Sequence, residues 1–322
     1  MQSHDPPLRL FGEVLGLSPL RLRLRQARIA LRGEEDVPPS TYDRTSLTQL
    51  RPRLARPLWR GRYAVHRQII VTNLFNHRQT PIEAGWSVKR TQTLDFRGRD
   101  LTYDSHNGTD FSMPVGSTVV AAAPGKVLRV ASEFNRGGLK VFIDHGQGLM
   151  TCTAHLARPL VEPGQTVSRG QPIALSGYSG LDAVVTLGLN TPHIHFNVWL
   201  NGEPIDPFPH DGRPSLWRAG ERPVPARDVD ADEAFAPSLF EADTVERGID
   251  ACITPAARRR LRAIRDLSQR AGALVAEMNY YPTRFHERVP VYAEPGERRP
   301  VLDLPVTAEQ FDGMVFADEL GR

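Results

Sequence analysis

Four histidines and one aspartate stand in three short motifs between residues 106 and 195. His106 and Asp110 open this segment, His155 lies in its middle, and His193 and His195 close it. A catalytic zinc ion usually takes three imidazole or carboxylate ligands from the protein and keeps a fourth position for water. We therefore predict a zinc site made of His106, Asp110 and one histidine of the closing pair, with hydrolysis as its chemistry.

The closing pair lies in the apolar run of residues 193–200, which is typical of a β-strand. Successive side chains of a strand alternate between its two faces, so His193 and His195 point to the same side. One face of this strand is therefore expected to hold two imidazoles.

The opening pair has a spacing of four, which would also suit one face of a helix. The intervening Asn107-Gly108 and the following Met113-Pro114 disfavour a helix, because these residues are typical of turns. We predict that His106 and Asp110 lie on a tight turn leading into a strand.

These motifs resemble those of the lysostaphin-type zinc metalloendopeptidases, which cleave peptide bonds in bacterial peptidoglycan. That family is marked by His-x-x-x-Asp, then a His-Leu pair, then His-x-His, and all three occur here in that order. The sequence between the motifs is similar as well, and the resemblance extends from about Trp86 to Pro207. It implies a mainly β fold, with an antiparallel sheet or sandwich that holds a groove.

The resemblance also implies a role for each residue of the motifs. His106, Asp110 and His195 bind one zinc ion per chain, while His155 and His193 stand beside the metal as catalytic groups without ligating it. Zinc lowers the pKa of its bound water from about 15.7 to about 7 and polarises the scissile carbonyl. Either histidine can then take the water proton, donate to the oxyanion or protonate the leaving amine.

The middle motif departs from the family at one position. Thr153 stands where the family commonly has a tyrosine, two residues before the middle histidine. All five polar residues of the three motifs are nevertheless present, which argues against a degenerate, non-catalytic copy.

The other histidines are interpreted as core or surface residues without a ligand role. A lone histidine in a strand is more often hydrogen-bonded than metal-bound. His145 lies in a turn-rich hairpin, where the lysostaphin-type family often has a histidine that does not bind the metal. The same interpretation applies to His66, His77, His210 and His286.

The amino-acid composition is that of a globular protein with enough apolar residues to form a buried core. The chain has 322 residues, enough for two or three units, with 40% hydrophobic and 24% charged residues. Its formal net charge of +3 suits anionic cell-wall polymers but is too small to indicate nucleic-acid binding. Cys152 and Cys252 form no metal motif, and we interpret them as buried free thiols.

We divide the chain into a β-rich segment (1–85), a zinc metalloendopeptidase domain (86–208) and a C-terminal extension (209–322). In the first segment, the Leu-Arg alternation of residues 20–25 predicts an edge strand, and residues 63–75 predict a second strand. In the extension, the Pro- and Arg-rich residues up to about 237 indicate a linker or wrapping loop.

One amphipathic helix is predicted over about 255–278. Thr254 is a good N-cap and Pro255 a good first helical residue, and apolar residues recur every three or four positions from Leu261 to Met278. Four arginines lie away from this stripe and form either a solvated basic face or a contact for an anionic polymer: Arg258, Arg259, Arg262 and Arg265.

The sequence thus predicts a zinc-dependent endopeptidase acting on peptidoglycan stem peptides or cross-bridges. The alternatives are a module that binds cell-wall peptides or activates a hydrolase, and an endopeptidase acting on another peptide. Residues 1–7 lack the features of a secretory signal, and no run approaches the ~20 apolar residues of a membrane span. As written, the chain is expected to be cytoplasmic, or in the cell envelope if its start is incomplete or export uses another route.

Overall fold

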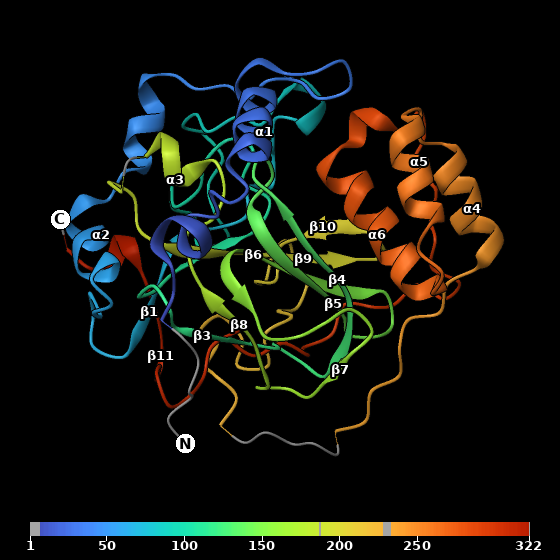
Figure 1. The fold of residues 1–322 in the computed structure, drawn as a ribbon. Helices are drawn as coiled ribbons and strands as arrows, with labels where there is room; N and C mark the ends of the chain where they lie inside the picture. Colours follow the sequence, from blue (N-terminus) through green and yellow to red (C-terminus); the bar gives the residue numbers. More distant parts are fainter. Residues whose placement is uncertain (1–6, 187, 228–232, 322) are drawn as a thin grey trace.

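Short β-branched and apolar runs, interrupted by glycine, proline and asparagine, form a central sheet in the computed structural model (Figure 1). The structure describes residues 7–186, 188–227 and 233–321. The strands are β1 (Gln68–Asn73), β2 (Thr109–Ser112), β3 (Thr118–Val120), β4 (Gly125–Glu133), β5 (Gly138–Asp144), β6 (Leu149–Pro159), β7 (Thr166–Val167), β8 (Pro172–Ser176), β9 (His193–Leu200), β10 (Glu203–Ile205) and β11 (Gly313–Phe316).

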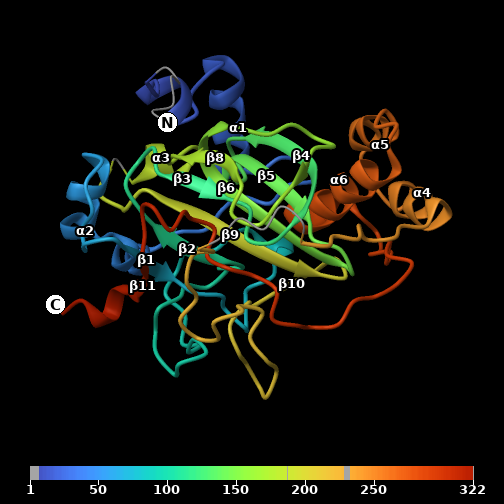
Figure 2. The same cartoon turned by 90° about the horizontal axis from the view of Figure 1, so that it is seen from below.

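Helices flank the sheet at both ends of the chain (Figures 1 and 2). The α-helices are α1 (Leu20–Arg32), α2 (Pro52–Trp59), α3 (Asp182–Val185), α4 (Ala242–Asp250), α5 (Pro255–Arg262) and α6 (Leu267–Tyr280). The short helical turns are η1 (Leu10–Val14), η2 (Arg44–Gln49), η3 (Ile82–Ala84), η4 (Pro282–Arg284) and η5 (Ala317–Glu319).

The sheet is almost entirely antiparallel, as predicted. Its main path runs β11-β1-β2-β9-β6-β5-β4-β7, with β10 paired to β9, and β8 paired to both β3 and β6. The exception is the parallel pair of β1 and β11, which places the last strand of the chain beside the first. The prediction of a mainly β protein is therefore confirmed.

Strand β9 separates two apolar cores. On one face, its alternate side chains Ile194, Phe196 and Val198 belong to a core that also contains Trp217 and Leu304 from the C-terminal part of the chain. Because both faces of the strand are covered, the whole run is buried up to residue 199. The first six residues nevertheless alternate between polar and apolar side chains, so only one face of this part of the strand is apolar.

The opposite face of β9 carries polar side chains at one end and Trp199 at the other. The Trp199 ring lies 5.9 Å from that of Phe142 on β5 and 5.8 Å from that of Tyr280 on α6. Helix α6 packs on this face beside β4 and β5, and α4 and α5 stand outside it (Figure 1). The C-terminal helices therefore share a face of the sheet with the two closing histidines.

The predicted edge strand at residues 20–25 is wrong, because these residues form the first two turns of α1. Leucine and arginine are both good helix formers without β-branching, so the Leu-Arg alternation is equally compatible with a helix. The buried face of α1 contains Arg23, whose guanidinium donates to the Ser132 carbonyl (3.0 Å) and to Ser132 Oγ (2.7 Å). The first segment is consequently more helical than predicted, with one central strand, β1, in the predicted region 63–75.

The single helix predicted over 255–278 is also wrong, because the structure has two helices there. Thr254 and Pro255 begin α5 as expected, but α5 ends at Arg262 and α6 begins at Leu267. The Asp266 side chain accepts a hydrogen bond from the Gln269 amide (2.9 Å), and this N-cap starts the second helix. The apolar residues thus keep their helical spacing in the sequence, although the N-cap at Asp266 divides the segment into two helices.

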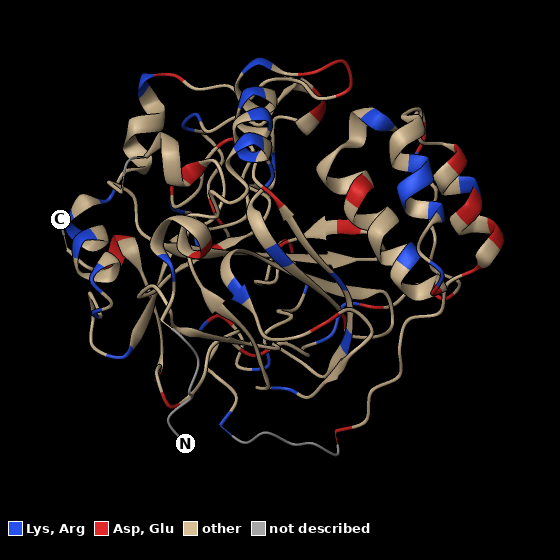
Figure 3. Cartoon of the chain, viewed as in Figure 1, with Lys and Arg blue, Asp and Glu red and all other residues tan. Residues whose placement is uncertain are grey.

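Basic residues are prominent on α1 and α5 (Figure 3). On α5, Arg262 is exposed and its guanidinium lies 2.6 Å from a carboxylate oxygen of Asp250 and 3.2 Å from one of Glu246. These ion pairs fit the interpretation of a solvated face.

The remaining expectations about the flanks have mixed outcomes. Both cysteines are buried free thiols, as predicted. The described residues between 209 and 237 form no helix or strand, and Trp217 is fully buried, so this segment wraps the core. None of the described helices has the length and apolar character needed to cross a bilayer. Residues 1–6, on which the expected lack of a secretory signal partly rests, lie outside the described residues, and the boundaries at 85/86 and 208/209 stay predictions.

We predict that His145 makes the fold sensitive to acid. Its Nδ1–H donates to the Pro124 carbonyl (2.9 Å), its Nε2 accepts from the Thr151 hydroxyl (2.8 Å), and burial lowers its pKa from 6.5 to about 4. A lowered histidine pKa contributes stability that is present above pH 6.5 and is lost as the pH falls toward 4, by about 1.4 kcal/mol per unit.

Urea unfolding of the metal-free protein between pH 7 and pH 4.5 measures this effect. His145→Gln should reduce the pH dependence of the unfolding free energy, whereas His286→Gln, at an exposed position, should leave it as in the unmodified chain. Equal pH dependence in both variants would contradict the assignment.

Candidate active site

Three elements bring His106, Asp110 and His195 together. Asp110 lies on β2 directly opposite His195 on the neighbouring antiparallel strand β9. His106 lies in the turn before β2, so the expectation of a turn leading into a strand is confirmed. Because opposite residues of paired strands point to the same face, the sheet itself places the carboxylate beside the imidazole.

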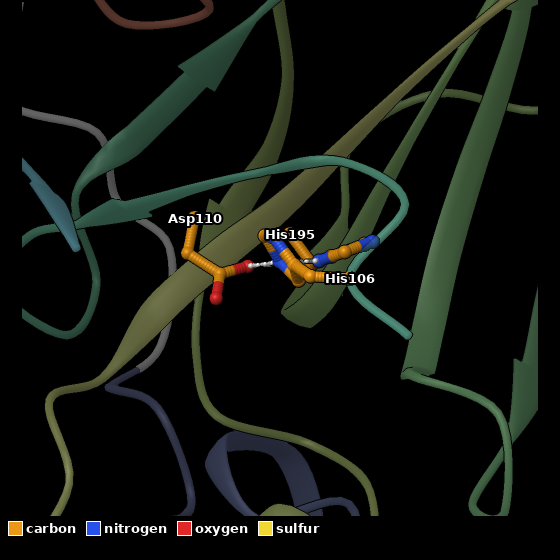
Figure 4. Close-up of side chains that lie close together, drawn as sticks. All are labelled: His106, Asp110 and His195. Carbon is orange, nitrogen blue, oxygen red and sulfur yellow. Dashed lines mark hydrogen bonds and ion pairs between the residues drawn. The ribbon is translucent and has the colours of Figure 1, made fainter. Parts of the chain in front are cut away.

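The facing atoms of these three side chains converge on one point (Figure 4). Asp110 Oδ1 lies 2.8 Å from His195 Nδ1 and 3.1 Å from His106 Nε2, and the two ring nitrogens are 3.2 Å apart. Ligands at about 2.1 Å from a tetrahedral zinc ion are separated by about 3.4 Å. The three atoms are therefore nearly as far apart as zinc ligands require, and the group can hold a metal ion.

The remaining polar atoms of these side chains are held by neighbouring groups. His106 Nδ1–H donates to the Leu74 carbonyl (2.7 Å), and Asp110 Oδ2 accepts from the Asn73 amide (2.9 Å). His195 Nε2 lies 3.2 Å from Asn107 Oδ1. Since a carbonyl oxygen only accepts, the His106 proton sits on Nδ1, and His106 Nε2 keeps its lone pair for a metal.

Burial and neighbouring charge favour the protonation states that bind a cation. All three side chains are buried. Burial alone raises the pKa of Asp110, but His106 and His193 outweigh it and hold that pKa well below its usual range. Burial lowers the pKa of His195. A neutral imidazole and an ionised carboxylate are the forms that ligate metals.

His155 reaches the site through an irregularity in β6. Three steps along β6, from Thr153 to Leu156, face only two along β5, and His155 has a φ of +59°. Such a bulge re-aims a side chain. The His155 ring donates from Nδ1 to the Ser179 carbonyl (2.8 Å), so Nε2 is the free nitrogen, 3.5 Å from Asp182 Oδ2. Burial, with a smaller effect of His193, lowers the pKa of His155 to about 3.

His193 lies between His155 and the group formed by Asp110 and its two histidine neighbours. Its Nδ1–H donates to the Thr191 carbonyl (2.9 Å), and its Nε2 lies 3.7 Å from Asp110 Oδ1. The centroids of the His193 and His155 rings are 4.9 Å apart. The structure therefore brings together all five residues predicted from the sequence.

Thr153 faces away from this site. It lies opposite Phe196, whose side chain belongs to the core on the other side of the sheet. A different phenol is close by: the Tyr178 ring lies 5.4 Å from His193 and 6.1 Å from His155.

Four of the five residues, Asp110, His155, His193 and His195, line a cavity of about 390 Å³, and His106 contacts two of them, Asp110 and His195. Segments outside the central motifs contribute to its walls, including Tyr42 and Leu47 before β1, Arg136 between β4 and β5, and Tyr280 at the end of α6. Segments outside the central motifs therefore form part of the cavity wall next to Asp110 and His195.

Two asparagines beside the site were not identified from the sequence. Asn197 donates to the Asn107 carbonyl (2.9 Å), lies 3.0 Å from His195 Nε2, and accepts from the Tyr280 hydroxyl (3.0 Å). Strand alternation could have found Asn197, because it lies two residues after His195 on the same face. No local sequence pattern indicates that Tyr280 donates a hydrogen bond to Asn197.

The histidines outside the motifs lie elsewhere. His77 and His210 stack with ring centroids 3.4 Å apart, and His77 Nε2 lies 2.9 Å from Asp206 Oδ2. Within the described residues, His106, Asp110 and His195 form the only group of His, Cys, Asp or Glu side chains placed to hold a metal ion.

Comparison with known proteins places the central segment. Residues 104–207 match the model of Peptidase family M23. An uncharacterized metalloprotease of Haemophilus influenzae is 34% identical over 149 residues, which are 46% of this chain and 26% of that protein. The peptidoglycan DD-endopeptidase ShyB of Vibrio cholerae is 40% identical over 130 residues, or 40% and 28% of the two chains.

Two further matches differ in kind. The murein hydrolase activator EnvC of Escherichia coli is 33% identical over 132 residues, which are 41% of this chain and 29% of that protein. The crystal structure of a zinc-containing peptidase from Vibrio cholerae has 32% identity, covers 44% of this chain and 38% of that one, and has a TM-score of 0.31.

The central sheet and its buried His-Asp-His group are those of a metallopeptidase domain. Residues 104–207 form a peptidase M23 domain, of the lysostaphin-type family, which confirms the resemblance seen in the motifs. The chain spans about a quarter of the length of the first curated relatives that it matches.

Gly108 should be essential for the position of His195. A Cβ at this residue would lie 2.8 Å from both His195 Nε2 and the Phe196 carbonyl oxygen. The carbonyl belongs to β9 and cannot yield, so Gly108→Ala should displace the His195 ring and weaken zinc binding by roughly 10- to 100-fold.

Competition with a chromophoric chelator measures the zinc affinity. Gly313→Ala is the matched control, since its Cβ would meet nothing closer than Gln68 Oε1 at 3.6 Å. A folded Gly108→Ala protein with unchanged zinc affinity would show that this contact does not position the ring.

Proposed function

We propose that this chain is a zinc-dependent endopeptidase that hydrolyses peptide bonds in peptidoglycan stem peptides or cross-bridges. The observation that carries the proposal is the convergence of Asp110 Oδ1, His106 Nε2 and His195 Nδ1, with two further imidazoles directed at the same cavity. We assign one zinc ion per chain to these three ligand atoms. A zinc ion held there supplies a Lewis acid that polarises a peptide carbonyl and acidifies water.

The protein's own groups would position this chemistry and move its protons. Asn73, Asn107 and the Leu74 carbonyl hold the outer atoms of the ligands, so the inner atoms need little rearrangement. His155 and His193 both fix their Nδ1 protons on backbone carbonyls and present Nε2. The neutral His155 ring accepts a proton at Nε2, and its low pKa makes it a ready donor to the leaving amine.

Peptidoglycan is supported as the substrate by relatives that are named for it. ShyA and ShyB of Vibrio cholerae are both named peptidoglycan DD-endopeptidases, and each is 40% identical to the segment that it matches. The mildly basic charge of the chain suits an anionic polymer. This substrate requires that the protein act in the cell envelope, which fractionation of the native protein tests against a cytosolic peptide substrate.

The competing function is a module that activates a partner hydrolase, because the chain is also similar to the murein hydrolase activator EnvC. A binding or activating module needs neither stoichiometric zinc nor two free imidazole nitrogens beside it. Four of the five polar residues line one cavity, and His106 contacts two of them, so this arrangement favours the enzyme.

The metal assignment predicts different outcomes at the two closing histidines. The purified protein should contain about one zinc per chain and release fragments from peptidoglycan sacculi, as identified by mass spectrometry. Asp110→Ala and His195→Ala should lose both zinc and fragment release. His193→Ala should keep zinc by elemental analysis and lose turnover.

Full zinc retention in Asp110→Ala would mean that the carboxylate ligand is misassigned. If His193→Ala loses the metal and His195→Ala keeps it, the roles of the two histidines are exchanged. Stoichiometric zinc with no fragment release from sacculi by the unmodified protein would favour the activating module.

His155→Ala tests proton transfer without touching a ligand. General acid or base groups contribute typically 10²- to 10⁴-fold, so kcat should fall by an amount in that range while zinc content and melting temperature stay unchanged. A loss below about threefold would remove His155 from the mechanism and leave His193 as the proton carrier.

A further inference from the structure

Arg136 is a buried arginine in the wall of the active-site cavity. It lies in the turn between β4 and β5, is 7% exposed, and lines the same cavity as His155, Asp110 and His195. The next residue, Gly137, accepts a hydrogen bond from the His155 backbone amide (2.8 Å). The backbone thus fixes Arg136 beside one of the two proposed proton carriers.

The partners of the Arg136 guanidinium are neutral. Nε donates to the Tyr280 carbonyl (3.0 Å) and Nη1 to the Asn135 carbonyl (3.2 Å), and the group lies 5.4 Å from the centre of the Tyr281 ring. Nη2 donates no hydrogen bond to any residue that the structure describes. No carboxylate of those residues forms an ion pair with Arg136.

Two other enclosed arginines have carboxylate partners, whereas the equally buried Arg23 donates to neutral groups such as those of Ser132 but does not line the cavity. Arg169 is 3% exposed and lies 3.1 Å from a carboxylate oxygen of Asp303, and Arg284 lies 2.6 Å from one of Glu277. A buried cation without an anion loses its hydration without gaining a Coulombic partner. Arg136 therefore has an unmatched charge at the cavity wall, in a position that a ligand can reach.

We propose that Arg136 binds a free carboxylate of the peptide substrate and thereby selects substrates with a carboxylate close to the cleaved bond. A guanidinium forms strong, directional hydrogen bonds to carboxylates, and a partly water-excluded cavity strengthens them. Asp182, beside His155, disfavours a second position for the same anion. This inference rests on the proposed peptidase function and names a subsite within it.

The experiment compares two forms of one substrate. Soluble cross-linked muropeptides are used either with their carboxylates free or with those carboxylates converted to carboxamides. The zinc-loaded full chain should cleave the free form with a kcat/KM roughly 10- to 100-fold higher, which is the size expected for a charged hydrogen bond. The difference should lie mainly in KM.

Variants assign the preference to Arg136. Arg136→Gln should reduce kcat/KM for the free form to that of the amidated form, which it should cleave as the unmodified enzyme does, and Arg136→Lys should recover part of the preference. Arg129→Gln is the matched control: Arg129 lies on β4, pairs with Glu133 (3.5 Å) and is not among the cavity-lining residues, so the preference should persist.

Equal cleavage of the two forms by the unmodified enzyme would overturn the proposal, and so would an equal loss on both forms in Arg136→Gln. If that variant does not fold, the comparison in the unmodified enzyme still decides. If neither form is cleaved, the peptidase function fails, and calorimetric binding of the two forms then tests the subsite alone. Indistinguishable affinities in that measurement would overturn it.

Discussion

The register between β2 and β9 is the constraint on which the candidate active site depends. It sets Asp110 opposite His195, and Phe111 opposite Ile194 on the other face. A slip of β9 by one residue would turn His193 and His195 into the apolar core and direct Ile194 and Phe196 to the site. Because large apolar side chains fill both cores, the same packing that stabilises the sheet also holds the ligand geometry.

Parts of the chain far from the three motifs complete the site. Helix α6 contributes Tyr280, whose hydroxyl donates to Asn197, and Asn197 lies against the His195 ring. Residues before β1 and the β4–β5 turn form other walls of the cavity. The sheet carries Asp110, His193 and His195, and segments outside the sheet line other parts of the same cavity.

Local patterns predicted the strand at residues 193–200 and the turn that precedes β2. Turn residues after His106 predicted the turn into β2, and the spacing of two placed His193 and His195 on one face. The same local reasoning failed where a pattern fits two structures. Leu-Arg alternation at residues 20–25 suits a strand or a helix, and only the contact of Arg23 with Ser132 on β4 selects the helix. The stripe from Leu261 to Met278 likewise did not reveal the cap at Asp266.

The sequence by itself determined the types of the donor residues and the common face of His193 and His195, because a period of two and the turn chemistry act over a few residues. Only the tertiary structure decided which atoms meet: Asp110 and His195 are separated by 85 positions, and Tyr280 and Asn197 by 83. Such pairings depend on strand order, on helix docking and on the bulge that turns His155 toward the cavity. Their free energy comes from burying surfaces that are brought together only by folding.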